Sequence, residues 1–146
     1  MRIMGLDIGT KRIGVAISDE LGLTAQGITT LPRAAARGAW GALRRLATEH
    51  GVSRIVVGLP LNMSGTEGPA AEAVRVFGDG AALALKLPVE YWDERLTTVS
   101  AQRVLLEGNL SRKKRREVID QVAATIILQS YLDAHPRQRH ERDAEP

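Results

Sequence analysis

The chain opens on Ile3-Met4-Gly5-Leu6-Asp7-Ile8-Gly9-Thr10-Lys11-Arg12-Ile13-Gly14-Val15-Ala16-Ile17-Ser18, two apolar runs joined by a short turn. This pattern predicts a hairpin of two buried β-strands. Asp7 is the exception in the first run. A carboxylate in a buried strand is costly unless a partner neutralises it, and a divalent cation is the strongest such partner. The alternative is an Asp that begins the turn, because Gly, Thr and Lys follow it.

Turn residues, prolines and helical spacing divide the rest of the chain. We expect three further strands, over residues 24–31, 54–59 and 88–92. We expect four helices, over residues 34–50, from 67 to about 77 or beyond, 98–107 and 112–131. Thr66 is the expected cap of the second helix, Thr97 or Thr98 that of the third, and Ser111 precedes the fourth.

The expected order is three strands followed by helices that alternate with two more strands and a final pair of helices. Strands joined through crossover helices are parallel neighbours, whereas the opening meander is antiparallel. The sequence therefore predicts an α/β fold with a mixed five-stranded sheet and helices on both faces. We expect one domain over residues 1–135 and a flexible charged tail over residues 136–146.

Composition narrows the class of protein. The chain has 146 residues, 44% of them hydrophobic and 25% charged, which is ordinary for one globular domain. It has no cysteine, which excludes disulfides, zinc–thiolate sites and a cysteine nucleophile. No apolar run has the length of a signal peptide or a membrane span. We expect a cytoplasmic protein that has no membrane partner.

Basic residues are grouped along the chain. Of its 20 basic residues 16 are Arg, the side chain best suited to phosphate. One group holds Arg33, Arg37, Arg44 and Arg45, and the other is Arg112-Lys113-Lys114-Arg115-Arg116. These groups favour a nucleic-acid partner, and the alternative is a solvated helix face. With only 3% aromatic residues for base stacking, we expect contacts with the backbone rather than the bases.

A second acid in an unusual place is Glu94. It follows the expected fifth strand, and ligands of α/β sheets gather at the carboxyl ends of strands. The alternative is that Asp93 and Glu94 are an acidic pair favouring a helix N-terminus, with Arg95 as a local ion-pair partner.

A third such acid is Asp120. Asp120, Ala124, Ile127, Leu128 and Tyr131 form one helical stripe, which is apolar except at Asp120. The alternative to a functional role is a salt bridge to Arg116 or Lys114.

Three isolated acids suit a hard cation. Carboxylate oxygens with water are the ligands that Mg²⁺ or Mn²⁺ prefers. Two such ions activate water and stabilise the leaving oxygen in phosphodiester hydrolysis. None of the three His residues lies in a comparable motif.

Four segments together resemble the bacterial YqgF/RuvX family, over nearly all of the chain before the tail. They are residues 4–16, 58–63, 93–98 and 111–115, the last followed by Asp120. The resemblance implies an RNase H-like fold and a metal-dependent nuclease that uses Mg²⁺ or Mn²⁺. Proteins of this family are proposed to process the 5′ end of pre-16S ribosomal RNA and are also described as Holliday-junction-resolvase-like.

The resemblance also implies roles for residues. The family's acidic site corresponds to Asp7, Glu94 and Asp120, as catalytic residues and metal ligands. The expected substrate contacts are Thr10, Lys11, Arg12, Asn62, Arg95, Arg112, Lys113, Lys114, Arg115 and Arg116. Junction resolvases proper usually carry a carboxylate at the end of the fourth strand, where this chain has Gly58-Leu59-Pro60. The carboxylate from the fifth strand takes its place.

Other functions stay open on sequence alone. A Holliday junction resolvase or a DNA nuclease of recombination and repair would use the same residues, and a resolvase would act as a homodimer rather than a monomer. A non-catalytic binding factor would have no use for carboxylates beside bound phosphates. A nucleotide-binding kinase shares the Asp-Ile-Gly-Thr turn but needs two such domains.

Overall fold

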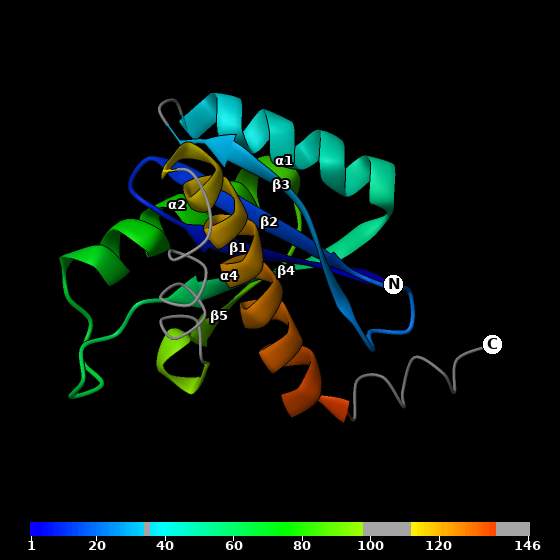
Figure 1. Cartoon of the computed structure of the whole chain (residues 1–146). Coiled ribbons are helices and arrows are strands. Elements are labelled where there is room, and N and C mark those ends of the chain that lie inside the picture. The colour runs from blue at the N-terminus through cyan, green and yellow to red at the C-terminus, as the bar shows by residue number, and fades with distance from the viewer. Residues whose placement is uncertain (34–35, 98–111, 137–146) are drawn as a thin grey trace.

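The computed structural model describes residues 1–33, 36–97 and 112–136 (Figure 1). The strands are β1 (Arg2–Ile8), β2 (Arg12–Ser18), β3 (Ala25–Pro32), β4 (Val52–Leu59) and β5 (Val89–Asp93). The helices are α1 (Ala36–His50), α2 (Pro69–Leu85), the 3-10 turn η1 (Glu94–Leu96) and α4 (Arg112–Ala134). No helix within these ranges is long and apolar enough to cross a membrane.

The five strands form one mixed sheet in the order β3-β2-β1-β4-β5. The hairpin partners β1 and β2 are antiparallel, as are β2 and β3, whereas β4 is parallel to both β1 and β5. This confirms the predicted mixed sheet and places β1, with Asp7 near its end, at the centre. Helices α1 and α2 are the crossovers that make the parallel pairings possible.

Helices cover both faces of the sheet, also as predicted (Figure 1). Alternate residues of β1 divide between the two cores: Leu6 and Ile8 pack with α1 and α2, while Ile3 packs with α4. Because successive side chains point to opposite faces, Asp7 lies on the face that α4 covers.

Helix α4 packs unusually close to the sheet, at two strand glycines. A Cβ atom on Gly14 would overlap the main-chain carbonyl of Asp120, and one on Gly5 would lie 2.6 Å from Cβ of Leu128. Glycine in a strand often marks close approach of another backbone. These two positions therefore fix where α4, and the acid it carries, lies over β1 and β2.

The start of helix α2 departs from the sequence prediction. Helix α2 begins at Pro69 with Gly68 as its N-cap and without a side-chain cap, so Thr66 is not the cap we predicted. Instead, the Thr66 hydroxyl accepts a hydrogen bond from Asn62 within the preceding loop. The helix continues to Leu85, in agreement with a predicted end at about residue 77 or beyond, and its C-cap is Lys86 in the left-handed conformation (φ 56°).

Some predicted elements lie outside the described residues. They are the helix over residues 98–107, the Thr98 and Ser111 caps, and the tail beyond Pro136. The described end of the fifth strand is followed by η1, in which the Thr97 hydroxyl donates to the Glu94 carbonyl. Thr97 thus closes this turn at its C-terminal end.

Candidate functional site

Asp7 lies at the centre of the sheet, near the carboxyl end of β1. Its side chain is only 4% exposed. In the antiparallel register Asp7 is opposite Gly14 of β2. In the parallel register Leu6 pairs with Val57, so the next position places Asp7 beside Gly58 of β4. Asp7 therefore has a glycine on each neighbouring strand, and both glycines leave room on its own face of the sheet.

Glu94 occupies the room above Gly58. It is the first residue of η1, directly after β5 ends at Asp93. A Cβ atom on Gly58 would lie 2.8 Å from Oε1 and 3.1 Å from Cγ of Glu94. The carboxylate at the end of β4, expected in junction resolvases, is thus absent from the strand, but a carboxylate from the end of β5 lies over the same place.

Asp120 lies on α4, over β2, whereas Glu94 lies over β4. The main chain of Asp120 lies against Gly14, and its carboxylate Oδ2 accepts a hydrogen bond from Nε of Arg12 at 3.0 Å. The two side chains are 30% (Arg12) and 15% (Asp120) exposed, so the ion pair is partly shielded from water. The side chains of the expected alternative partners, Lys114 and Arg116, lie outside the described residues; among the described ones, Asp120 pairs with Arg12, which is 108 residues away.

Asp7, Glu94 and Asp120 therefore lie on the same face of the sheet, the latter two over the glycines beside Asp7. Their oxygen atoms are the ligand type that suits a hard divalent cation. Within the described ranges, however, no three Asp, Glu or His side chains already form a group that could hold a metal ion. The donor set and the space above Gly58 fit a metal centre, whereas Asp120 is engaged with Arg12.

Asp93 has a different role from Glu94. Its carboxylate accepts hydrogen bonds from the Arg95 main-chain N–H at 2.9 Å and from the Arg95 guanidinium at 2.7 Å. The Arg95 side chain is the largest cause that lowers the pKa of Asp93. Asp93 thus caps η1 and pairs with Arg95, which is the alternative that the sequence left open for this acidic pair.

Several of the predicted substrate contacts lie near the carboxylates. Thr10 and Lys11 are exposed in the turn that follows Asp7. Asn62 is exposed but organises its own loop, because its side chain donates to Thr66 and its carbonyl accepts from Gly65 N–H. Arg95 also holds this loop, through a hydrogen bond from Nη1 to the Met63 carbonyl at 3.2 Å. The Met63 side chain itself is 99% exposed.

The described residues of the first basic group do not converge on the site. Helix α1 carries Arg37, Arg44 and Arg45 on the face of the sheet opposite Asp7. Arg33 instead braces the turn after β1, because its guanidinium donates to the Gly9 carbonyl at 2.7 Å. The side chains of residues 112–116 lie outside the described part, although α4 begins at Arg112.

Sequence reasoning missed the glycines and the role of Arg12 as the partner of Asp120. Gly14 and Gly58 were a usable signal, since isolated glycines inside strand patterns indicate close approach of another segment. The pairing of Arg12 with Asp120 had no such signal, because only the packing of α4 on β2 brings them together.

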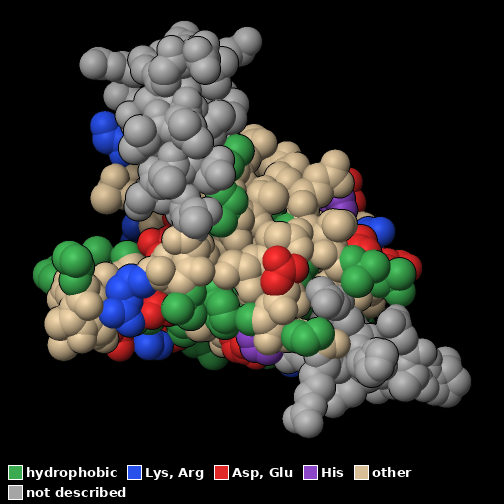
Figure 2. All heavy atoms as spheres, turned by 60° about the horizontal axis from the view of Figure 1, so that its bottom comes forward, with side chains coloured by type: hydrophobic (Ala, Val, Ile, Leu, Met, Phe, Trp, Pro, Cys, Tyr) green, Lys and Arg blue, Asp and Glu red, His purple; other side chains and the backbone are tan. Residues whose placement is uncertain are grey.

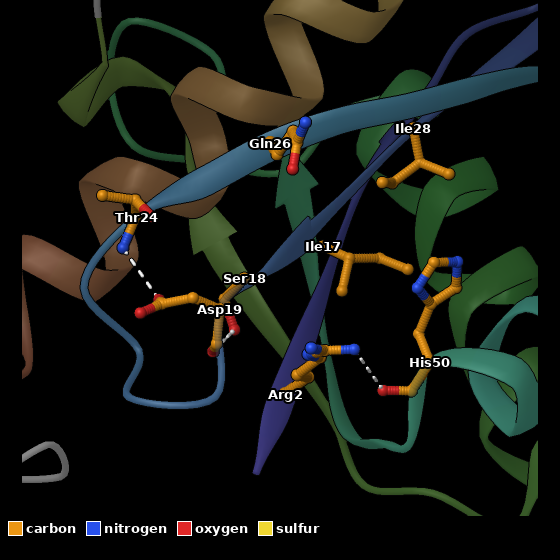
Figure 3. A pocket seen from close by; sticks show the side chains of 8 residues that line it. All are labelled: Arg2, Ile17, Ser18, Asp19, Thr24, Gln26, Ile28 and His50. Atoms are coloured by element: carbon orange, nitrogen blue, oxygen red, sulfur yellow. Dashed lines mark hydrogen bonds between the residues drawn. The ribbon is translucent and has the colours of Figure 1, made fainter.

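The described part of the chain also has two hollows apart from the carboxylates. One pocket is lined by Arg2, Ile17, Ser18, Asp19, Thr24, Gln26, Ile28 and His50 (Figure 3). Arg2 begins β1, so this pocket lies at the opposite end of the strand from Asp7. The other is an open groove between the end of β5 and α4, lined in part by Trp92, Leu96, Thr97, Ile126 and Ser130. This groove is next to Glu94.

The surface is mixed in character. Figure 2 shows small groups of hydrophobic side chains between acidic and basic ones, rather than one basic field. Exposed apolar residues of the chain include Met63, Val76, Leu83 and Leu96. On the face that Figure 2 shows, charge alone therefore does not mark a nucleic-acid surface.

Comparison with known proteins assigns the family. Residues 1–134 match the family model described as "RuvX: Holliday junction resolvase". The chain is 62% identical over 135 residues to a protein of Myxococcus xanthus named "Putative pre-16S rRNA nuclease", covering 92% of this chain and 89% of that one. A relative from Moorella thermoacetica with the same name is 61% identical over 133 residues, covering 91% and 95%.

Solved structures agree on the fold. RuvC of Thermus thermophilus, in complex with a Holliday junction substrate, matches with a TM-score of 0.58 at 16% identity over 94% of this chain and 96% of that one. The fowlpox virus Holliday junction resolvase matches with a TM-score of 0.52 at 16% identity over 92% and 99%. These structural matches show an RNase H-like fold. The family match and the close relatives go further: the chain belongs to the RuvX family and is a nuclease, a phosphodiester hydrolase.

Proposed function

We propose that this nuclease depends on Mg²⁺ or Mn²⁺ and that Asp7, Glu94 and Asp120 together hold two ions. The observation that carries the proposal is the arrangement around Asp7: Glu94 lies over Gly58, and Asp120 lies over Gly14. Strands β1 and β5 and helix α4 thus each bring one carboxylate to the same face. A bound pair of such ions supplies an activated water and stabilises the leaving oxygen.

The chain's own residues then have separable tasks. The three carboxylates position the metal ions: Asp7 lies on β1, Asp120 on α4, and Glu94 in the turn η1 directly after β5. Lys11 and Thr10, exposed in the turn next to Asp7, are placed to contact substrate phosphates. Arg95 keeps the loop after β4 in place through its bonds to Asp93 and Met63. Contacts of this kind hold the nucleic-acid backbone without reading its sequence.

We propose the 5′ end of pre-16S ribosomal RNA as the substrate. The support is the name of the relatives, which are 62% and 61% identical over nearly the whole chain. Such a role would place the protein in the cytoplasm. The test compares purified protein on a 5′-extended 16S precursor, a matched single-stranded DNA and a four-way DNA junction under one Mn²⁺ condition. Preferential cleavage of the precursor is expected, and cleavage of the junction alone would contradict the assignment.

Junction resolution is the second candidate function. The description of the matching family model favours it. Against it, β4 (Val52–Leu59) carries a glycine, Gly58, next to its last residue, and the carboxylate above that glycine comes from Glu94. In the same comparison of substrates, paired symmetric cuts in the four-way junction, made by a dimer, would support it.

Gly58→Ala is expected to reduce cleavage about 10- to 100-fold while the protein stays folded. The new methyl group would meet Oε1 of Glu94 and Cδ1 of Ile127, which are both ends of flexible side chains. The Glu94 side chain must therefore move away from its place over Gly58, whereas overpacking costs only about 1–3 kcal/mol. Single-turnover cleavage and thermal unfolding measure the two effects.

Gly41→Ala is the matched control, because a Cβ atom there would meet only the end of the Arg45 side chain at 3.9 Å. Its cleavage rate should equal that of the wild type. Unchanged cleavage by Gly58→Ala would show that the position of Glu94 over β4 has no part in the reaction.

Replacing Arg112, Lys113 and Arg115 together with Ala is expected to weaken nucleic-acid binding for all sequences alike. These residues begin α4, about two helical turns before Asp120, so phosphates bound there would lie roughly 11 Å from the carboxylates along the helix. Fewer phosphate contacts also flatten the dependence of affinity on salt. Fluorescence anisotropy over a salt series measures the affinity and its dependence on salt. If neither changes, this segment is a solvated helix start that does not bind phosphates.

A further inference from the structure

We propose that Arg12 couples metal binding to substrate binding by holding Asp120 until a phosphate draws its guanidinium away. This inference rests on the proposed metal centre and adds a regulatory step to it. Without substrate, Arg12 competes with the cation for the Asp120 carboxylate. With substrate, the same guanidinium binds a phosphate group, and Asp120 becomes available to the metal.

The contact between Arg12 and Asp120 has the geometry that such an exchange needs. One nitrogen, Nε, donates to one carboxylate oxygen at 3.0 Å. Within the described residues, Arg12 makes no other side-chain hydrogen bond, so both Nη nitrogens keep donors for a further anion. The pair is partly exposed, which leaves a path for a phosphate to reach the guanidinium.

The backbone fixes Arg12 beside the other carboxylates. Arg12 is the first residue of β2, and its carbonyl accepts a hydrogen bond from Gly9 N–H at 2.8 Å across the turn. Gly14, two residues later on the same face, lies opposite Asp7 and under the main chain of Asp120. The guanidinium is therefore tethered at the edge of the site, and only its side chain needs to move.

The chemistry favours exchange over simultaneous binding. A guanidinium and a divalent cation that share one carboxylate repel each other, whereas a guanidinium pairs well with phosphate in bidentate geometry. If substrate and metal each favour the state in which Arg12 has left Asp120, each raises the affinity for the other by the same factor.

The ion pair between Arg54 and Glu90 provides a matched control. Its Nη1–Oε1 distance is 3.1 Å, and the side chains are 34% and 45% exposed. Arg54 pairs with Ile3 near the start of β1, at the end of the sheet remote from Asp7. Loss of this pair removes the same charge from the protein without touching the proposed metal ligands.

The experiment titrates Mn²⁺ by calorimetry into wild type, Arg12→Gln and Arg54→Gln, with and without a short single-stranded phosphorothioate oligonucleotide. Arg12→Gln is expected to bind Mn²⁺ about threefold to fivefold more tightly than wild type in the absence of the oligonucleotide. The oligonucleotide should raise Mn²⁺ affinity in wild type and Arg54→Gln, and much less in Arg12→Gln. If Arg12→Gln does not fold, Arg12→Lys keeps the charge but lacks the planar fork, and should show the same reduced enhancement.

A double-mutant cycle distinguishes the loss of the Arg12–Asp120 ion pair from the loss of one positive charge on the protein. In an Asp120→Asn background the Arg12→Gln change should no longer alter Mn²⁺ affinity, because the carboxylate for which Arg12 competes is gone. An effect of equal size in that background, or no effect in the wild-type background, would overturn the coupling while leaving the metal centre intact. No Mn²⁺ binding by the wild-type protein, with or without the oligonucleotide, would instead overturn the proposed metal centre itself, and this inference with it.

Discussion

Asp7→Asn is expected to lower the cleavage rate by at least about 10²- to 10³-fold, with the protein still folded. Asp7 lies between the positions of Glu94 and Asp120 at the centre of the sheet. In the proposed metal centre it is therefore the ligand that is next to both of the other carboxylates. An amide has nearly the same shape but binds divalent cations far more weakly than a carboxylate does. The loss should therefore appear in turnover rather than in nucleic-acid affinity.

The fold of this variant should be as stable as the wild type or slightly more stable. Asp7 is 4% exposed, and taking an ionised carboxylate out of water opposes folding. Thermal unfolding in the absence of metal is the measurement. A large loss of stability would show that Asp7 serves mainly to hold the fold together, and near-wild-type turnover by the folded variant would remove it from the metal site.

Gly14→Ala is expected to destabilise the protein by about 3 kcal/mol or more, which for a domain of this size lowers Tm by roughly 10 °C. The added methyl group would overlap the main-chain carbonyl of Asp120. Backbone within a helix cannot turn aside as a side chain can, so α4 must move off the sheet. Part of the core formed by Ala124, Ile127 and Leu128 would move with it.

Gly41→Ala again serves as the control and should leave Tm equal or higher, because alanine favours a helix by up to about 1 kcal/mol over glycine. Calorimetry on both variants gives the comparison. If Gly14→Ala unfolds at the same temperature as Gly41→Ala, the close contact of α4 with β2 is not the feature that positions Asp120.

Much of the fold could be predicted because its signals are local. The hairpin of β1 and β2 follows from two apolar runs around Gly9-Thr10-Lys11, and the end of α1 follows from Gly51, which adopts a positive φ of 67°. The start of α2 could not be predicted in the same way. Thr66 has the chemistry of a cap, but the loop after β4 uses its hydroxyl to bind Asn62.

Some residues of the candidate site could likewise be predicted from local sequence, and others could not. Asp7 and Glu94 could be identified because a carboxylate at the end of a buried strand is conspicuous in sequence. The contact of Asp120 with Arg12 could not, since sequence spacing points only to candidates on the same helix, whereas Arg12 reaches Asp120 through tertiary packing. The role of Gly58 also depends on packing, because it becomes evident only when the carboxylate of the next strand is placed above it.

The most direct test of the metal centre is single-turnover cleavage, at saturating Mn²⁺, by Asp7→Asn, Glu94→Gln and Asp120→Asn, and by the Asp7→Asn/Glu94→Gln double variant. Asp93→Asn is the control, since Asp93 caps η1 and pairs with Arg95. Residues that serve one centre fail as a unit, so each single variant should fall to the same low rate and the double variant no lower, while Asp93→Asn loses much less. Near-wild-type cleavage by any of the three single variants, or losses that multiply in the double variant, would contradict a single metal centre built on these carboxylates.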